Sequence, residues 1–137
     1  MESHHKFVEN LWIFSKNGTP IIEIFHNTEL DSSLLGLFLA AIDDFSKKIG
    51  GSDLKSVNIG DGKFILTSCL KDNIYLVGKC NLKVKDKVVR KIFKIFTQFF
   101  EELYTVDEIM SQKWDSDMAF FDIFKDRIDL YFKMSNL

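Results

Sequence analysis

The chain opens with a predicted β-hairpin. Its first segment, Val8–Ser15, is apolar on both faces, which is typical of a strand that is covered on both sides of its sheet. Asn17-Gly18 follows, and both residue types tolerate the positive φ angles of tight turns. The second segment, Ile21–His26, is preceded by Pro20, which donates no ladder hydrogen bond and therefore favours an edge strand.

The pattern then changes to a helical period. Asp31 or Thr28 is the predicted N-cap of a helix that runs to about Ile49, and Gly50-Gly51 is its predicted end. With 100° of rotation per residue, one apolar stripe forms along this helix, and we expect that stripe to face the core. The stripe consists of Leu34, Phe38, Ala41, Ile42, Phe45 and Ile49.

Three strands are predicted next. Lys55–Ile59 alternates weakly and indicates an edge strand, whereas Lys63–Leu70 and Asn73–Cys80 are nearly continuous apolar runs that suit central strands. Gly60-Asp61-Gly62 and Lys71-Asp72 are the predicted hairpin turns between them.

Helical patterns fill the rest of the chain. Asp86–Tyr104 is amphipathic, Thr105–Glu108 is a capping box that restarts a helix, and the last helix runs from Ser116 to about Met134. The inward residues expected on the first of these helices are Val88, Ile92, Ile95, Phe96, Phe99 and Leu103. Those expected on the last helix are Phe120, Phe121, Phe124, Ile128, Tyr131 and Phe132.

This order, β-β-α-β-β-β-α-α, predicts an α/β fold, an α+β sandwich, with one five-stranded antiparallel sheet. Strand order 2-1-5-4-3 places both weak strands at the edges and leaves one helix for one face and two for the other. The 137 residues suit a single domain, 1–137, in which residues 1–7 are expected to be flexible.

The opening hairpin reads IFSKNGTPI from Ile13 to Ile21, and GDGKFILTSC follows at 60–69. With the element order, these segments resemble a longin domain, most closely the first longin domain of the trafficking exchange factors that activate lysosomal Rab GTPases. The resemblance covers about Val8–Tyr104 and the C-terminal helix. The related roadblock domain has a similar core but starts with a helix, which this chain does not.

The resemblance implies a longin/profilin-like fold of the roadblock/longin superfamily. It also implies a homo- or heterodimer with another longin- or roadblock-type domain, and a small Ras-like GTPase as partner, in nucleotide exchange or membrane trafficking. In the exchange-factor relatives the paired longin domains hold the GTPase, and no single longin residue carries the chemistry. No catalytic residue is therefore transferred to this chain.

Small residues on the first helix indicate where a partner docks. Gly36 and Ala40 lie one turn apart, opposite the expected core stripe, so another backbone can approach them closely. The resemblance adds that longin-like domains pair through this helix and an edge strand. The predicted interface is Ile22, Ile24, Leu35, Gly36, Leu39 and Ala40, with an apolar ridge on the last helix formed by Ala119, Ile123, Leu130 and Met134.

Charge is unevenly distributed along the chain. The net charge of −2 gives no indication of nucleic-acid binding. Residues 79–94 nevertheless contain seven basic residues and one acid, whereas residues 101–130 contain nine acids and three bases. Either the basic stretch is an ordinary solvated face, or it binds acidic lipid or an acidic partner. Its predicted patch is Lys87, Arg90, Lys91 and Lys94.

No catalytic or metal-binding constellation is recognisable. Gly60–Lys63 precedes a strand, not the helix that a phosphate-binding loop needs, and there is no Gly-x-Ser-x-Gly motif. Histidines and paired acids are better explained as solvated or frayed positions. These are His4, His5 and His26, Asp115 and Asp117, and the stripe Asp122, Asp126 and Asp129. We therefore expect no enzyme activity, cofactor or metal.

Cys69 and Cys80 are expected to be reduced, because a tight turn at Lys71-Asp72 places them about 20 Å apart along the hairpin, too far for a disulfide. Both are also expected to be semi-buried. Since no signal peptide or membrane span is evident, we expect a cytoplasmic protein with, at most, peripheral membrane contact. Two other functions remain open: a SNARE- or coat-subunit-like longin, and a free-standing lipid- or ligand-sensing module.

Overall fold

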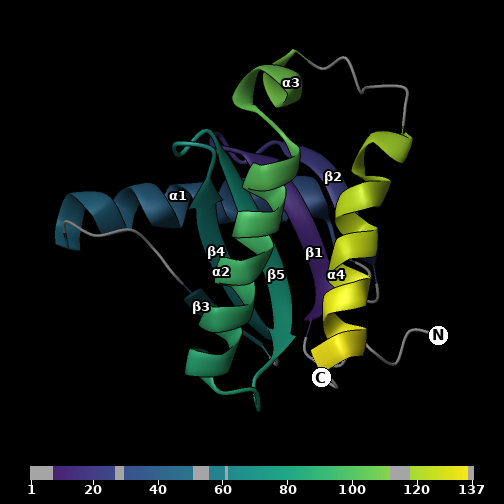
Figure 1. Cartoon of the computed structure of the whole chain (residues 1–137). Helices are drawn as coiled ribbons and strands as arrows, with labels where there is room; N and C mark the ends of the chain where they lie inside the picture. The colour runs from purple at the N-terminus through teal and green to yellow at the C-terminus, as the bar shows by residue number, and fades with distance from the viewer. Residues whose placement is uncertain (1–7, 27–29, 51–55, 61, 112–117, 136–137) are drawn as a thin grey trace.

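The computed structural model describes residues 8–26, 30–50, 56–60, 62–111 and 118–135 (Figure 1). The strands form one antiparallel sheet in the order β2-β1-β5-β4-β3, as the sequence predicts. Their bounds are β1 (Val8–Ser15), β2 (Pro20–His26), β3 (Ser56–Ile59), β4 (Gly62–Cys69) and β5 (Ile74–Asn81).

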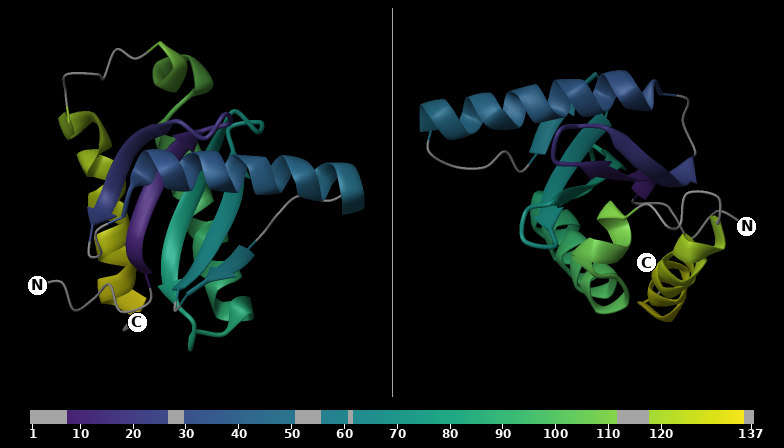
Figure 2. Two further views of the ribbon diagram at one scale, coloured as in Figure 1. Left: turned by 180° about the vertical axis from the view of Figure 1, so that it is seen from behind. Right: turned by 90° about the horizontal axis from the view of Figure 1, so that it is seen from above.

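Helices cover the two faces of the sheet unequally. Helix α1 (Ser32–Gly50) crosses one face, and α2 (Asp86–Leu103) and α4 (Asp122–Ser135) lie side by side on the other (Figure 2). A short helix α3 (Val106–Met110) follows α2, and a 3₁₀ turn η2 (Met118–Phe121) leads into α4. The predicted distribution of helices, one against two, is confirmed.

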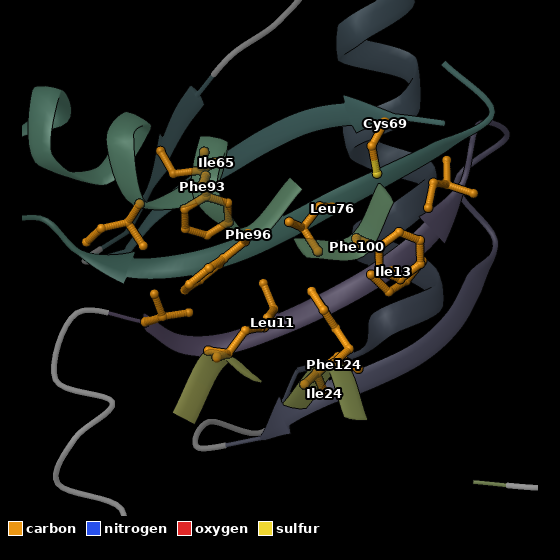
Figure 3. Close-up of a cluster of buried hydrophobic side chains, with 14 of the residues drawn as sticks. Leu11, Ile13, Ile24, Ile65, Cys69, Leu76, Phe93, Phe96, Phe100 and Phe124 are labelled. Atoms are coloured by element: carbon orange, nitrogen blue, oxygen red, sulfur yellow. The ribbon is translucent and has the colours of Figure 1, made fainter. Parts of the chain in front are cut away.

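Each face of the sheet has its own core. On the α2/α4 side, Leu11 and Ile13 of β1 and Leu76 of β5 meet phenylalanines such as Phe96 and Phe124 (Figure 3). On the α1 side a smaller cluster joins alternate residues of the same strands to the helix: Trp12, Phe14, Phe64, Leu66, Val77 and Leu39. The double burial of β1 explains its unbroken apolar run.

Two of the predicted turns and two of the predicted caps form as expected, whereas Thr28, Gly51 and Asp61 of the remaining predictions lie outside the described residues. Gly18 has a φ of 89° in the first hairpin, and Lys71 and Asp72 have φ of 57° and 65° in the last one. Asp31 caps α1, because its Oδ1 accepts a hydrogen bond from the Leu34 N–H at 3.0 Å. Thr105 and Glu108 form the predicted reciprocal capping box at the start of α3.

The predictions for α2 and α4 need partial correction. Val88 is exposed, whereas Val89, Phe93 and Phe100 are buried, so α2 is rotated slightly from its predicted orientation. Gly78 of β5 explains part of this rotation, because a Cβ there would lie 2.1 Å from the Phe93 ring. The predicted start of the last helix, Ser116, lies outside the described residues, and within them a 3₁₀ turn precedes α4, which starts at Asp122.

Candidate functional site

The cysteines are structural and do not form a reactive site. Cys69 pairs with Ile74 near one end of the β4–β5 hairpin and Cys80 pairs with Lys63 near the other, so they are far apart as predicted. Both are free thiols and fully buried rather than semi-buried. Burial raises the pKa of each thiol to about 12, which keeps both of them protonated and poorly nucleophilic at neutral pH.

Stability should therefore fall at alkaline pH. The unfolded chain releases its thiol protons near pH 9.0 and the folded chain near pH 12, so the stabilisation is complete below pH 9 and is lost above it. We expect the free energy of unfolding to fall by up to about 1.4 kcal/mol per pH unit for each thiol. Denaturant titrations between pH 8 and 10.5 measure this slope, and a flat profile would contradict it.

Metal chemistry finds no support in the part of the chain that the structure describes, where no group of three His, Cys, Asp or Glu residues is placed to hold an ion. His4, His5, Asp115 and Asp117 lie outside the described residues, as does the side chain of His26. Asp122 and Asp126 are exposed on α4, while Asp129 is half-buried. Likewise, no helix in the described ranges is long and apolar enough to cross a bilayer.

Helix α1 lies on the sheet with the opposite face from the one that its apolar stripe predicts. Gly36, Leu39 and Asp43 are the buried residues of the helix. Hydrophobic periodicity favoured the other face, because it carries larger apolar side chains. The prediction that Leu34, Phe38, Ala41, Phe45 and Ile49 face the core is therefore wrong, since all five are exposed, and Ile42, the sixth residue of the predicted stripe, is half-buried.

Two local contacts explain this orientation. The first hairpin approaches α1 so closely that a Cβ on Gly36 would lie 1.9 Å from the carbonyl oxygen of Gly18. Two turns further along the buried face, Asp43 accepts a hydrogen bond of 2.6 Å from the Tyr75 hydroxyl and pairs with Lys47 at 3.2 Å. Burial, and then this bond to Asp43, raises the pKa of Tyr75 to about 12.

The outer face of α1 consequently presents an apolar stripe to solvent. Leu34, Phe45 and Ile49 are 63%, 61% and 73% exposed, and Phe38 is 44% exposed. Single exposed apolar residues are common on soluble proteins, but a continuous line of them usually marks an interaction site. We call this surface the α1 stripe: Leu34, Leu37, Phe38, Phe45 and Ile49.

Several residues of the predicted partner interface lie inside the domain instead. Gly36 and Leu39 contact the sheet, and Ile24 of β2 belongs to the α2/α4 core, so none of the three is available to a partner. Ile22, Leu35 and Ala40 are half-buried. The small residues did indicate a close backbone approach, but the backbone that approaches them is the chain's own hairpin.

The apolar ridge on α4 is exposed, so of the two partners expected for it, the preceding long helix α2 and another protein, helix α2 does not cover it. Ile123, Leu130 and Met134 are 51%, 54% and 75% exposed, and Ala119 is exposed beside them. The inward face of the same helix places Phe124, Ile128 and Phe132 in the core, as predicted. The ridge is a second candidate surface, on the opposite side of the sheet from the α1 stripe.

The predicted basic patch on α2 is also exposed. Lys87, Arg90, Lys91 and Lys94 all lie on the solvent side of the helix. The patch excludes Lys79, which is buried and pairs with Glu9 at 2.7 Å. Its nearby acid, Asp86, is held by Lys63, and the hydrogen bond and charge of Lys63 lower the pKa of Asp86.

Comparisons with known proteins support the fold. No protein-family model matches the sequence, and no curated protein is similar to it in sequence. Among solved structures, MglB of Myxococcus xanthus matches with a TM-score of 0.54 and 19% identity, over 73% of this chain and 90% of that one. The chain has the roadblock/longin fold.

A Roadblock/LC7 domain from Streptomyces avermitilis matches with a TM-score of 0.48 and 11% identity, over 60% of this chain and 72% of that one. The predicted longin-type fold is confirmed by the MglB match together with the sheet order. Among the described residues, three exposed surfaces are available to a partner: the α1 stripe, the α4 ridge and the basic patch on α2.

Proposed function

We propose that this chain is a non-enzymatic adaptor: a single longin-type domain that pairs with a second copy of itself and binds a small Ras-like GTPase. The observation that carries the proposal is the α1 stripe, an uncovered apolar face on a roadblock/longin fold. The resemblance of the hairpin to longin domains supports pairing through this helix.

The spacing of the α1 stripe favours a second copy over a different partner. About a midpoint between Ala41 and Ile42, Leu34 mirrors Ile49 and Phe38 mirrors Phe45. A two-fold axis at this midpoint makes the stripe complementary to itself, with Phe38 of one copy against Phe45 of the other in an antiparallel helix pair. Such a pair buries four of the five residues of the α1 stripe, Leu34, Phe38, Phe45 and Ile49.

The GTPase is proposed from the longin resemblance, since paired longin domains hold a GTPase in the exchange-factor relatives. The test uses Ras-like GTPases immobilised in their GDP-bound form and with a non-hydrolysable GTP analogue. We expect the chain to bind at least one GTPase with a preference of tenfold or more for one nucleotide state. Nucleotide-release kinetics then separate exchange from simple binding. Failure to bind any of the GTPases in either state would contradict this part of the proposal.

A second candidate function, contact with anionic membrane, is favoured by the surface around the start of α2. Leu82 and Val88 are exposed apolar residues among the cations Lys87 and Lys91. Basic residues near an anionic bilayer contribute about 1 kcal/mol each, and exposed apolar side chains add to the attraction.

Vesicle binding tests this candidate. We expect sedimentation with phosphatidylserine vesicles in low salt, reduced about tenfold or more by the double substitution Lys87→Glu and Lys91→Glu. Vesicles of phosphatidylcholine alone are the control and should not sediment the protein. Equal binding to both vesicle types, or none to either, would exclude the electrostatic contact.

A further inference from the structure

The turn of the first hairpin contains a dipeptide that can react with itself. Asn17 is the one asparagine of the sequence that is followed by glycine. Because glycine has no side chain, its backbone nitrogen is unshielded and can attack the side-chain carbonyl carbon of the asparagine before it, with loss of ammonia. Asn17 is exposed, and its side chain forms no hydrogen bond with any described residue. The side-chain amide is therefore accessible to this reaction.

Hydrogen bonds close the turn around this dipeptide. The N–H of Gly18, which carries the attacking nitrogen, donates to the Ser15 carbonyl at 2.9 Å, and the Ser15 N–H donates to the Thr19 carbonyl at 2.8 Å. Asn17 is the third residue of the turn and does not belong to the described non-glycine residues with positive φ. A bond between the first and fourth residues with a negative φ at the third is typical of a type I turn, in which ψ at the third residue is about 0°.

This geometry protects Asn17 while the turn is closed. Formation of the five-membered ring needs the Cβ of Asn17 and the nitrogen of Gly18 on the same side of the bond that joins the Asn17 Cα to its carbonyl carbon. A ψ of about 0° instead holds these two atoms roughly 120° apart around that bond. The attacking nitrogen also keeps its proton in the hydrogen bond to Ser15. The reaction therefore requires the hairpin to open.

Gly18 is also the residue through which the hairpin packs against α1 (Figure 2). A Cβ on Gly18 would lie 2.3 Å from the carbonyl oxygen of Gly36 and 3.1 Å from the side chain of Ala40, so the backbone of Gly18 has no room to shift toward the helix. A longer main chain between Asn17 and Gly18 would displace Gly18 and break this contact.

We propose that Asn17-Gly18 is a self-modification site, which converts opening of the first hairpin into a covalent change of the chain. In the open hairpin the Gly18 N–H loses its proton to hydroxide, and the nitrogen bonds to the Cγ of Asn17. The side-chain nitrogen takes up a proton and leaves as ammonia. Water then hydrolyses the succinimide: cleavage of the new bond gives aspartate, and cleavage of the original peptide bond gives isoaspartate.

The two products should affect the fold differently. Aspartate adds a negative charge but leaves the main chain of the turn unchanged. In isoaspartate the main chain runs through the former side chain and is one methylene longer, so Gly18 can keep neither its bond to Ser15 nor its contact with Gly36. The hairpin of this product should therefore open more often. The inference is independent of the GTPase, of pairing and of membrane contact, since none of them takes part in the reaction.

Peptide mapping by mass spectrometry tests the site. The protein and a synthetic peptide of residues 11–25 are incubated in mildly alkaline buffer. Asn17 should gain about one mass unit in both, but about 10- to 100-fold more slowly in the protein, because only molecules with an open hairpin react. Asn73, in the turn of another hairpin but followed by isoleucine, is the internal control and should stay unmodified. The variant Asn17→Gln should not react, because its ring would need one more atom.

Hydrogen exchange of the same amide measures the opening independently. The Gly18 N–H exchanges only when its bond to Ser15 breaks, so its protection factor should match the slowing of deamidation within about threefold. Gly36→Ala, which forces α1 away from the hairpin, should speed up the modification about tenfold. Phe124→Leu weakens the core on the other face of the sheet and should leave the rate within about threefold of the parent protein.

The purified products test the consequence. In the isoaspartate product, separated by ion exchange, the Gly18 amide should exchange at least about tenfold faster than in the parent protein. The variant Asn17→Asp has the same added charge without the extra methylene and should exchange at the parental rate. The proposal would be overturned by modification as fast as in the peptide, or by none after about a hundred half-lives of the peptide. Equal acceleration by Gly36→Ala and Phe124→Leu, or unchanged Gly18 exchange in the isoaspartate product, would also overturn it.

Discussion

Replacing Gly36 by alanine should lower the free energy of unfolding by about 3 kcal/mol. The new Cβ would lie 1.9 Å from the carbonyl oxygen of Gly18 and 2.9 Å from its carbonyl carbon, and no side-chain rotation can relieve a clash with backbone. Helix α1 must therefore move away from the hairpin and disturb the packing of its Leu39 in the cluster that contains Phe14. Overpacking costs about 1–3 kcal/mol and sometimes more, which exceeds the ~1 kcal/mol that alanine gains in helix propensity.

Equilibrium denaturation measures this loss, which corresponds to a fall in Tm of about 10 °C. Gly60→Ala is the matched control. Gly60 has a φ of 61° but no atom within 4 Å of an added Cβ, so only the backbone cost of about 1–2 kcal/mol should remain. If Gly36→Ala were as stable as the parent protein, the close contact between the hairpin and α1 would be refuted.

The second large effect is expected on pairing. Replacing both Phe38 and Phe45 by glutamate should raise the dimer dissociation constant about 1,000-fold. Loss of an interface aromatic costs about 2 kcal/mol or more, and each 1.4 kcal/mol is a factor of ten in the dissociation constant. The fold should survive, because both side chains are exposed in the single domain and glutamate is a good helix former.

Light scattering after size exclusion detects this change as a fall from about twice the chain mass of 15.9 kDa to that mass. The matched control replaces Ile123 and Leu130 of the α4 ridge by glutamate, which adds the same charge and removes exposed apolar residues from another helix. The control should remain dimeric. If only the control variant became monomeric, pairing would be assigned to the α4 ridge instead of the α1 stripe.

The order of the strands in the sheet could be predicted because the apolar pattern of each strand indicates which of its faces are buried. The nearly continuous apolar runs within β1, β4 and β5 indicate burial on both faces, and the weak β3 and the proline at the start of β2 indicate edges. Once these positions are assigned, only one distribution of helices covers both faces. The inward face of α4 was equally readable, because its phenylalanines recur at helical spacing.

The buried face of α1 could not be predicted in the same way, because apolar residues lie on two different faces of this helix. Periodicity favours the face with the larger side chains, yet the contact with the hairpin requires Gly36, and the sheet offers Tyr75 as a partner for Asp43. Both determinants are tertiary contacts between segments distant in sequence. One sequence signal was available: a glycine turn and a helical glycine indicate two backbones in contact, although not which two.

The candidate sites also divide into those that local sequence patterns predict and those that depend on tertiary contacts. The exposed cations of α2 and the ridge of α4 could be read from local periodicity. Periodicity also detects four of the five residues of the α1 stripe, Leu34, Phe38, Phe45 and Ile49, but places them in the core. The cavity of about 500 Å³ that residues of α1, β4 and α2 line could not be predicted, since it depends on how these three elements pack together.

Disulfide cross-linking tests the pairing of α1 most directly. Because Cys69 and Cys80 are buried, a cysteine introduced on α1 is the reactive thiol of the described residues. In an antiparallel pair, Ala41 lies beside the two-fold axis, whereas the two copies of Ile49 are about 22 Å apart at 1.5 Å per residue. Mild oxidation should therefore cross-link Ala41→Cys but not Ile49→Cys. Cross-linking of neither variant, or of both equally, would contradict the proposed pair.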